Sequence, residues 1–351
     1  MSVDSSSSSR SWIKGLFLVV IFLLLSGGAV AFYLYQMVFG ENVTITESQW
    51  IDIPSTISGN ADLAEQLYYQ GIIKDKESFI FTAQQMSYTP KAGRYRMPNT
   101  VKSNRALLQK LRGKRMTVNV TFQNLRTKEA LAAVVAKGIQ ADSLSLIQLF
   151  NDKEFLATEG FTPDDVMVVF IPNTYEFYWN TTAEQFWEKM LAEYKKFWTE
   201  ERLQQAQVLE KTAIEVSILA SIVESESQYK PERPKIAGVY LNRLRKNWKL
   251  EADPTVVFAV GDFTLKRVLN KHLETDSPYN TYLYEGLPPG PIYMPSINSI
   301  DAVLNAEEHQ YMFFCAKPPA EGEAPNQHAF AKTHRAHINN AKKYWRWIRS
   351  Q

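Results

Sequence analysis

Two glutamates, Glu224 and Glu226, end an apolar run that reads "ILASIVESES" from residue 218. A carboxyl group held against apolar surface is a candidate for acid–base chemistry, because loss of water raises its pKa toward neutrality. At the helical angle of about 100° per residue, Glu226 lies between the directions of Leu219 and Ile222, and Glu224 lies on the opposite side. This periodicity favours Glu226 as the half-buried acid. If the helix ends before Glu226, both acids are solvated, and the pattern alone does not decide between these arrangements.

The segments after the glutamates predict the elements that position them. Residues 236–244 read as an apolar helix. In "ADPTVVF", Asp253 is predicted as the N-cap of a further helix, with Pro254 at its first position. The stretches "YNTY" and "GLPPGPI" are rich in aromatic residues, Pro and Gly, and they predict a rigid loop that holds the wall of a groove. "MFFCA", residues 312–316, reads as a buried strand, and an amphipathic helix ends the chain.

The composition excludes several classes of function. The net charge is +2, from 39 basic and 37 acidic residues, and we find no basic face interleaved with aromatics, so no nucleic acid is expected as a partner. Cys315 is the only cysteine, which excludes an intrachain disulfide. The five histidines form no HExxH pattern, and no phosphate-binding GxxxxGK[ST] loop is present. No metal and no cofactor are therefore expected, and packing or substrate hydrogen bonding is favoured for His328.

Residues 13–35 form an apolar run that predicts a transmembrane helix. Apart from Lys14 the run carries no charge, and it is long enough to cross a bilayer. Arg10 and Lys14 precede it, and the next basic residue is Lys74, so the positive-inside rule places the N-terminus in the cytoplasm. A cleaved signal peptide is the competing interpretation, because "AVA" at residues 29–31 resembles a cleavage site. We favour the uncleaved anchor, since the apolar run continues beyond it.

The next segments predict a small α+β module. Residues 43–53 alternate as a strand does, and Asn60 is a good N-cap for a helix that Gly71 ends. A second helix is expected from about Asp75, followed by a strand at residues 93–97 and a helix that ends at Gly113.

A similar order of elements follows, with a strand at residues 116–122 and helices within residues 127–150. When Gly71 is set over Gly138, Asp75 aligns with Asp142. Either the module is duplicated, or two helical hairpins share a common pattern.

Two further segments have two interpretations each. Residues 168–182 contain a strand and a dense aromatic cluster, which suits carbohydrate stacking but is more often core. Residues 183–213 form an amphipathic helical region in which Phe186, Met190 and Tyr194 recur at helical spacing. Packing of this region is favoured over membrane binding.

Six motifs occur in a fixed order: "ASIVESES", "AGVYLNRL", "ADPTVVF", "YNTY", "GLPPGPI" and "HAF". In this order they resemble the YceG/MltG-like endolytic murein transglycosylases, over roughly residues 40–348. The resemblance implies an α+β protein with small LysM-like modules and a mixed α/β catalytic domain that has a lysozyme-like active-site helix. The expected divisions are a cytoplasmic stub (1–12), a transmembrane helix (13–35), a LysM-like module (40–115), a second module or linking region (116–195) and the catalytic domain (196–351). Two departures are Pro295-Ser296, where the family usually has Pro-Gly, and "IPSTISG", which lacks the commoner glycine-rich start.

The resemblance also implies a reaction and its residues. Members of the family cleave glycan strands of peptidoglycan between N-acetylmuramic acid and N-acetylglucosamine, and they leave 1,6-anhydro ends without consuming water. The catalytic acid maps to Glu226, and Ser227 completes a Glu-Ser pair that is typical of lytic transglycosylases. Glu224 is then a supporting residue. Further groove residues match the family's motifs: Asn242, Asp253, Tyr279, Asn280, Tyr282 and His328.

The implied setting is the inner membrane, with a single pass, the catalytic domain in the periplasm and peptidoglycan synthases as partners. Two other functions stay open. One is a non-catalytic, membrane-anchored scaffold that binds peptidoglycan. The other is a muramidase-type hydrolase, which needs a second carboxylate, and Asp253 is the nearest candidate in sequence.

Overall fold

The computed structural model describes residues 8–319 and 326–351, and it divides into two compact units. Of the predicted cytoplasmic stub, residues 1–7 lie outside the described residues. The first unit contains the described residues up to 118 together with residues 178–180, and the second contains residues 119–177 and 181–351. Apart from residues 116–118 and 178–180, the segments predicted as a second module and as a catalytic domain therefore fall within one unit.

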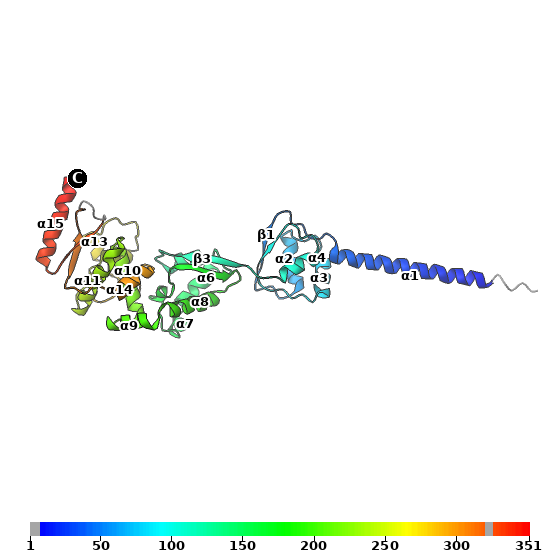
Figure 1. Ribbon diagram of the computed structural model, residues 1–351, viewed down its shortest axis with the longest axis horizontal. Helices are drawn as coiled ribbons and strands as arrows, with labels where there is room; N and C mark the ends of the chain where they lie inside the picture. The colour runs from blue at the N-terminus through cyan, green and yellow to red at the C-terminus, as the bar shows by residue number, and fades with distance from the viewer. Residues whose placement is uncertain (1–7, 320–325) are drawn as a thin grey trace, which may run out of the picture. The chain divides into compact units, whose positions relative to one another are not determined.

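Helix α1 (Ser8–Phe39) opens the first unit (Figure 1). Its segment Lys14–Phe39 has a mean hydropathy of 2.6 and is long and apolar enough to cross a membrane. The C-terminal end of α1 contacts the folded part of the unit, where Thr82 Oγ1 and Asn104 Nδ2 donate hydrogen bonds of 3.1 and 2.9 Å to the carbonyl oxygen of Met37. The helix thus continues into the unit without an intervening linker.

The folded part of the first unit is a small α+β module whose strands enclose two helices in sequence. Strand β1 pairs antiparallel with β2, in a register that runs from Gln49↔Met97 to Ile53↔Gly93. Apolar side chains of β1, β2 and three helices form one core. The elements are β1 (Gln49–Ile53), α2 (Asn60–Tyr69), α3 (Lys76–Gln85), β2 (Gly93–Met97) and α4 (Asn104–Leu111).

Two local predictions for this module need correction. The strand expected over residues 43–53 is shorter, because only Gln49–Ile53 pairs with β2. The N-cap of α2 is Gly59 and not Asn60, whose amide donates instead to the carbonyl oxygen of Tyr88. The expected stop at Gly71 is confirmed, since this residue follows α2 with φ +67°, a conformation that favours glycine.

The second unit begins with the same order of elements: a strand, two helices and a strand that pairs with the first. Asp75 caps α3 and Asp142 caps α6, and each carboxylate accepts a hydrogen bond from the backbone N–H of the serine three residues later. The alignment of Asp75 with Asp142 is therefore a structural equivalence as well, which favours duplication. The elements are β3 (Thr117–Phe122), α5 (Lys128–Val135), α6 (Ser143–Asn151), α7 (Lys153–Ala157), η1 (Val166–Val169) and β4 (Asn173–Tyr178).

Aromatic residues build the core of this part of the second unit. Phe122, Phe150, Phe170 and Phe186 lie in mutual ring contact at centroid distances of 5.0–6.5 Å. Along β4, Tyr175 and Phe177 are buried. The core interpretation of the aromatic cluster is confirmed for these inward residues. The amphipathic region is two helices, α8 (Ala183–Phe197) and α9 (Glu200–Val208), and its three apolar residues at helical spacing are buried.

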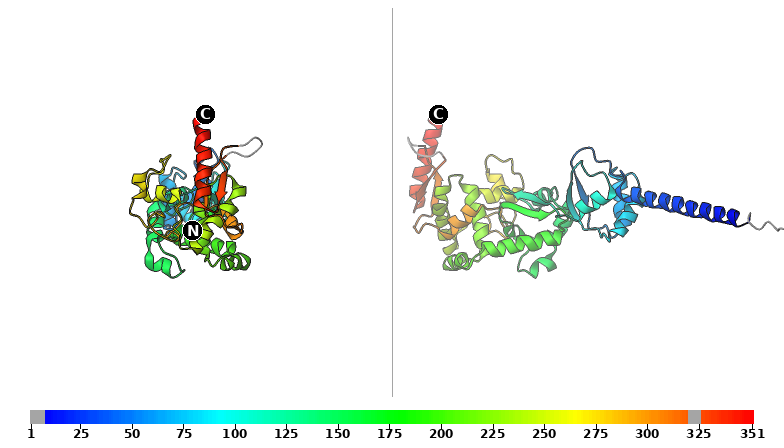
Figure 2. Two further views of the ribbon diagram at one scale, coloured as in Figure 1. Left: turned by 90° about the vertical axis from the view of Figure 1, so that its left-hand side faces the viewer. Right: turned by 45° about the vertical axis from the view of Figure 1, so that its right-hand side comes forward.

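Helix α10 (Ala213–Glu226) is the central helix of the remaining part. A capping box of Thr212 and Glu215 begins it, and every residue from Val216 to Val223 is buried. Helices α11, α12 and α14 pack around it. Figure 2 shows α15 as the terminal element of the unit; it contacts the antiparallel pair β5–β6. The elements are η2 (Lys230–Glu232), α11 (Arg233–Arg245), α12 (Asp253–Val260), α13 (Asn270–Leu273), α14 (Ile297–Leu304), β5 (Phe313–Ala316), β6 (His328–Ala331) and α15 (His334–Ser350).

Candidate active site

Glu226 is the last residue of α10, so the arrangement in which the helix ends before it is wrong. Its side chain is half-buried, and the hydroxyl of Tyr240 on α11 donates a 2.6 Å hydrogen bond to its Oε1. Burial, together with the negative charge of Asp253, raises the pKa of Glu226 to about 7, against the opposing effect of the Tyr240 hydrogen bond. The carboxyl group is therefore divided between its acid and base forms near neutral pH.

A cavity of about 240 Å³ opens at Glu226. Arg243 is buried at its wall, where it donates 2.9 Å to the carbonyl oxygen of Met312 and lies 3.6 Å from the Glu251 carboxylate. The positive charge of Arg243 lowers the pKa of Glu226, so it limits the rise that burial causes. The lining combines carboxylates, a guanidinium, phenols and an imidazole: Glu226, Tyr240, Arg243, Glu251, Asp253, Tyr282, Phe314, Cys315, Ala316 and His328.

Asp253 and Tyr282 form a second hydrogen-bonded pair in this cavity. The predicted N-cap role of Asp253 is wrong: Ala252 is the N-cap residue of α12, and Asp253 is already helical. Its carboxylate instead accepts a 2.7 Å hydrogen bond from the Tyr282 hydroxyl. Asn280 is fully buried and fixes this loop, because its amide donates to the carbonyl oxygens of Leu273 and Thr275 while its Oδ1 accepts from the Tyr282 N–H.

A second cavity, of about 430 Å³, also reaches Glu226 and Asp253. Its walls come from the loop after β3, from α12 and from the loop that follows α12. The residues that line it are Arg126, Ser225, Glu226, Asp253, Pro254, Val257, Phe263, Leu265, Lys266, Arg267 and Val268. Since Glu226 and Asp253 line both cavities, the two cavities meet at these carboxyl groups.

His328 faces the first cavity from β6 and is held by a buried carboxylate. The carboxylate of Glu232 accepts a 2.9 Å hydrogen bond from the backbone N–H of His328, and its other oxygen lies 2.7 Å from Nδ1 of the His328 ring. If Nδ1 carries the proton, Nε2 stays free to accept a hydrogen bond. A carboxylate that fixes a histidine ring in this way orients the ring's second nitrogen.

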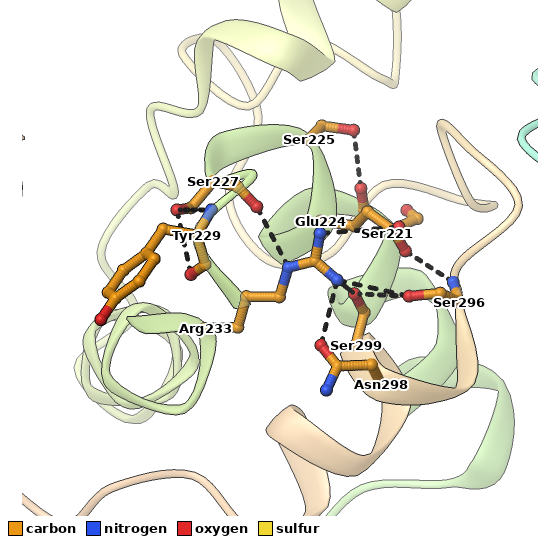
Figure 3. A network of polar contacts seen from close by, with 9 residues as sticks. All are labelled: Ser221, Glu224, Ser225, Ser227, Tyr229, Arg233, Ser296, Asn298 and Ser299. Atoms are coloured by element: carbon orange, nitrogen blue, oxygen red, sulfur yellow. Dashed lines mark hydrogen bonds and ion pairs between the residues drawn. The ribbon is translucent and has the colours of Figure 1, made fainter. Parts of the chain in front are cut away.

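Glu224 belongs to a different network, which Figure 3 shows. Its Oε2 accepts a 2.5 Å hydrogen bond from the Ser296 N–H at the start of α14, and its Oε1 lies 3.7 Å from Arg233 Nη2. Arg233 is buried and also donates to Ser299 Oγ at 2.8 Å and to the carbonyl oxygen of Ser227 at 3.0 Å. Glu224 therefore joins α10 to α11 and α14. It was expected to point away from the core, yet only 14% of its side chain is exposed, because these partners cover it.

Ser227 is the C-cap residue of α10 and is buried. Its Oγ accepts a 3.1 Å hydrogen bond from the Tyr229 N–H, and its carbonyl oxygen accepts from Arg233. These contacts fix the turn after Glu226, and Ser227 is absent from the lining of either cavity at Glu226.

Two of the predicted groove residues lie elsewhere in the unit. Asn242 donates hydrogen bonds of 2.8 and 3.1 Å to the carbonyl oxygens of His309 and Tyr311, beside a separate cavity of about 690 Å³. The ring of Tyr279 contacts that of Phe258 in a tilted arrangement at a centroid distance of 4.7 Å, and Tyr279 lines a cavity of about 170 Å³. The structure brings together Glu226, Asp253, Tyr282 and His328, but it does not bring these two residues into the cavities at Glu226.

Sequence reasoning missed Tyr240, Glu232, Arg243 and Arg126. Tyr240 was present in the motif "AGVYLNRL", and its place 14 residues after Glu226 gives no periodic signal, because the two residues lie on different helices. Glu232 is 96 residues from His328 in sequence. Among the described residues no group of three or more His, Cys, Asp or Glu side chains is arranged to hold a metal ion.

The family of the chain follows from its match to the YceG-like family over residues 51–343. The chain belongs to the YceG-like family. The match contains both cavities at Glu226 and every residue of the Glu224 network.

Relatives of this YceG-like chain have a common name. It is 44% identical over 126 residues to the endolytic murein transglycosylase of Bacillus subtilis, which is 36% of this chain and 33% of the relative. It is 25% identical to that of Streptococcus pneumoniae strain R6, in an alignment of length 363 that covers 92% of this chain and 65% of the relative. The chain thus spans less than two thirds of each relative's length. A crystal structure of a YceG-like protein from Listeria monocytogenes superposes with a TM-score of 0.55 at 26% identity, over 84% of this chain and 99% of the other.

Proposed function

We propose that this chain is an endolytic murein transglycosylase that cleaves the β-1,4 bond between N-acetylmuramic acid and N-acetylglucosamine. The observation that carries the proposal is the Glu226 carboxyl group, half-buried at the junction of two cavities and with its pKa raised to about 7. Such a group donates a proton and later accepts one at the same pH. The names of the relatives in Bacillus subtilis and Streptococcus pneumoniae support the substrate class.

In the proposed reaction, Glu226 acts first as acid and then as base. Protonated Glu226 gives its proton to the glycosidic oxygen as the bond from that oxygen to C1 of the muramyl residue breaks. Carboxylate Glu226 then removes the proton of the C6 hydroxyl as O6 forms a bond to C1. The products are a new 4-hydroxyl end and a 1,6-anhydro end, so atoms balance without water. One carboxylate suffices because the sugar supplies its own nucleophile.

The neighbouring residues are proposed to hold Glu226 and the sugar. Tyr240 fixes Oε1 and stabilises the carboxylate, which keeps the pKa from rising further. His328, oriented by Glu232, and the pair of Asp253 and Tyr282 offer hydrogen-bond partners to hydroxyl and N-acetyl groups. Glu224 and Ser227 are proposed to position the end of α10, and Asn280 to position Tyr282. Asn242 and Tyr279 support the same unit outside the two cavities.

A hydrolase is the second candidate, and one observation favours it. Asp253 lines both cavities with Glu226, so a second carboxylate is present where a hydrolase needs one to activate water. The hydrogen bond from Tyr282 occupies one oxygen of that carboxylate, and the transglycosylase is preferred for this reason together with the names of the relatives. A non-catalytic scaffold is disfavoured by the raised pKa of Glu226 in an open cavity.

The first unit is proposed to be a membrane-anchored module. Its order of strand, two helices and strand is that expected of a LysM-like fold, and the equivalent elements at the start of the second unit form the second copy. The two basic residues before the apolar run support a cytoplasmic N-terminus and an extracytoplasmic second unit. Contact with peptidoglycan synthases at the membrane is part of the same proposal.

The test is digestion of purified murein by the full-length protein in detergent, with the products weighed by mass spectrometry. Anhydro ends support the transglycosylase, whereas ends heavier by one water support the hydrolase. The absence of any product, from protein whose fold is verified by circular dichroism, contradicts both and favours the scaffold.

A further inference from the structure

Arg126 is a guanidinium held between two aromatic rings at the second cavity. Its Cζ lies 5.1 Å from the ring centroid of Phe263 and 5.1 Å from that of Tyr293. The adjacent backbone is fixed as well, since the Met294 N–H donates a 2.8 Å hydrogen bond to the carbonyl oxygen of Leu125. Contacts with ring faces leave the N–H groups in the plane of the guanidinium free to donate.

The N–H groups of Arg126 are not used by the protein itself. In the described ranges 8–319 and 326–351, its guanidinium forms no hydrogen bond and no ion pair, although the side chain is half-buried. Other arginines of the same unit that are buried to a similar or greater extent have acceptors: Arg233 has Ser299, and Arg243 has Met312. An arginine that is fixed in place yet lacks an acceptor is a candidate for binding an anion.

The charges around Arg126 favour an anion on this side of Glu226. Lys266 and Arg267 line the same cavity and are exposed. The acids of the lining are Glu226, which is partly protonated near neutral pH, and Asp253, which accepts from Tyr282. Three cations therefore face two carboxyl groups of which one is only partly charged.

We propose that Arg126 binds an anionic group, a carboxylate or a phosphate, carried by the glycan strand on the second-cavity side of Glu226. The inference rests on the proposed function and names a determinant of its specificity. Murein carries peptides with free carboxylates on its muramyl residues, and a strand still attached to its lipid carries a pyrophosphate. A guanidinium binds either anion through two parallel N–H···O bonds. The enzyme then distinguishes peptide-bearing or lipid-linked strands from bare glycan.

The test compares cleavage of murein strands that carry their stem peptides with cleavage of the same strands after an amidase has removed the peptides. For the full-length wild-type protein we expect kcat/KM to be about tenfold higher on the intact strands, as one charge-assisted hydrogen-bonded contact supplies. Arg126→Gln is expected to bring this ratio close to one, and Arg126→Lys to restore it in part, because Lys keeps the charge but loses the planar pair of donors. Arg115→Gln is the matched control, since Arg115 stacks on Tyr178 in the first unit and is expected to keep the wild-type ratio.

Other outcomes identify the source of the anion or show that Arg126 has only a structural role. In one outcome, removal of the peptides leaves the wild-type kcat/KM unchanged, but cleavage of the lipid pyrophosphate lowers the rate of wild type and not that of Arg126→Gln. The anion is then the phosphate, and the proposal stands. If Arg126→Gln lowers the rates on all strands by one factor, Arg126 only supports the loop that carries Phe263, and the proposal is overturned. An Arg126→Gln protein that matches wild type on every substrate overturns it too.

A binding measurement distinguishes failure of the anion site from failure of the proposed function. If wild-type protein of verified fold cleaves none of these strands, the transglycosylase proposal fails. Pull-down of intact and stripped strands by Glu226→Gln protein, with and without Arg126→Gln, still tests anion recognition. A preference for intact strands that disappears with Arg126→Gln supports the site, and equal binding by both proteins overturns it.

Discussion

The surroundings of Glu224 and of Glu226 differ although the two residues are of one type and are separated by a single serine. Glu224 is covered by Arg233 and the start of α14, and each of its oxygens has a partner. Within the described part of the chain, the Glu226 carboxyl group accepts one hydrogen bond, from Tyr240, and it opens onto two cavities. The comparison shows how two acids near one helix end differ in their surroundings. Arg233 and the Ser296 N–H occupy the oxygens of Glu224, whereas burial with few donors leaves Glu226 divided between acid and base near neutral pH.

The largest effect is expected from Glu226→Gln. The amide keeps the shape and can still accept from Tyr240, but it gives no proton to the glycosidic oxygen, so we expect the rate of murein cleavage to fall about 10³-fold or more. Product formation measured by mass spectrometry, with the melting temperature as a control of the fold, checks this. Wild-type activity in this variant contradicts the assignment of Glu226.

Glu224→Gln is expected to act on stability rather than on chemistry. Removal of the negative charge leaves Arg233 buried with neutral partners only, and we expect the free energy of unfolding to fall by about 3 kcal/mol. The folded fraction is expected to retain cleavage. Denaturant unfolding of this variant is compared with Asp301→Asn, which breaks a more exposed ion pair with Arg202 and is expected to change stability by less than about 1 kcal/mol. Loss of all activity from folded Glu224→Gln protein would remove the contrast between the two acids.

The stability of the protein is expected to depend on pH through Glu226. The folded pKa of Glu226 is raised from 4.5 to about 7, so the folded state binds more protons between these values and loses stability as pH rises through this window. Above pH 7, Glu226→Gln is therefore expected to be more stable than wild type by about 3 kcal/mol, and below pH 4.5 the two proteins are expected to match. Unfolding by urea across this range measures the difference. A constant difference at every pH is incompatible with a raised pKa.

The smallest expected effect is that of Tyr240→Phe. The Tyr240 hydrogen bond lowers the pKa of Glu226, so its removal raises that pKa above about 7. The decline of activity on the alkaline side, where the acid is lost, is then expected to move to higher pH, with a maximum rate reduced by roughly tenfold because the carboxylate is less stabilised as a product of proton transfer. A pH–rate profile checks the direction. A shift to lower pH contradicts the role given to Tyr240.

The sequence predicted the local features of the fold well. The helix start near Asp75, the alignment of Asp75 with Asp142 and the buried aromatics at the start of the second unit depend on residues within one turn or one strand, where periodicity and capping are visible. The N-caps at Asn60 and Asp253 were each predicted one residue too late, because each of these side chains has a partner distant in sequence that competes for it.

The candidate site was only partly visible in the sequence. The acid and the loop of Tyr282 stood out through composition and motif order. Glu232 and Tyr240 could not be assigned, since their roles depend on packing between separate elements. Asn242 and Tyr279 lie in matching motifs, yet their side chains lie outside the cavities at Glu226, where Asn242 holds backbone carbonyls and Tyr279 contacts the ring of Phe258. The motifs thus contain residues of the site and residues that support it, and only the three-dimensional structure separates the two kinds.

The hydrogen bonds from Thr82 and Asn104 to the last turns of α1 set a condition for studying the protein in water. A protein that begins at residue 40, directly after α1, lacks the carbonyl of Met37, and with it an acceptor for the fully buried Asn104. The soluble boundary therefore lies inside the helix rather than after it. The last turns of the membrane helix are at the same time the first turns of the folded unit, and the two cannot be separated by a cut without a loss of stability.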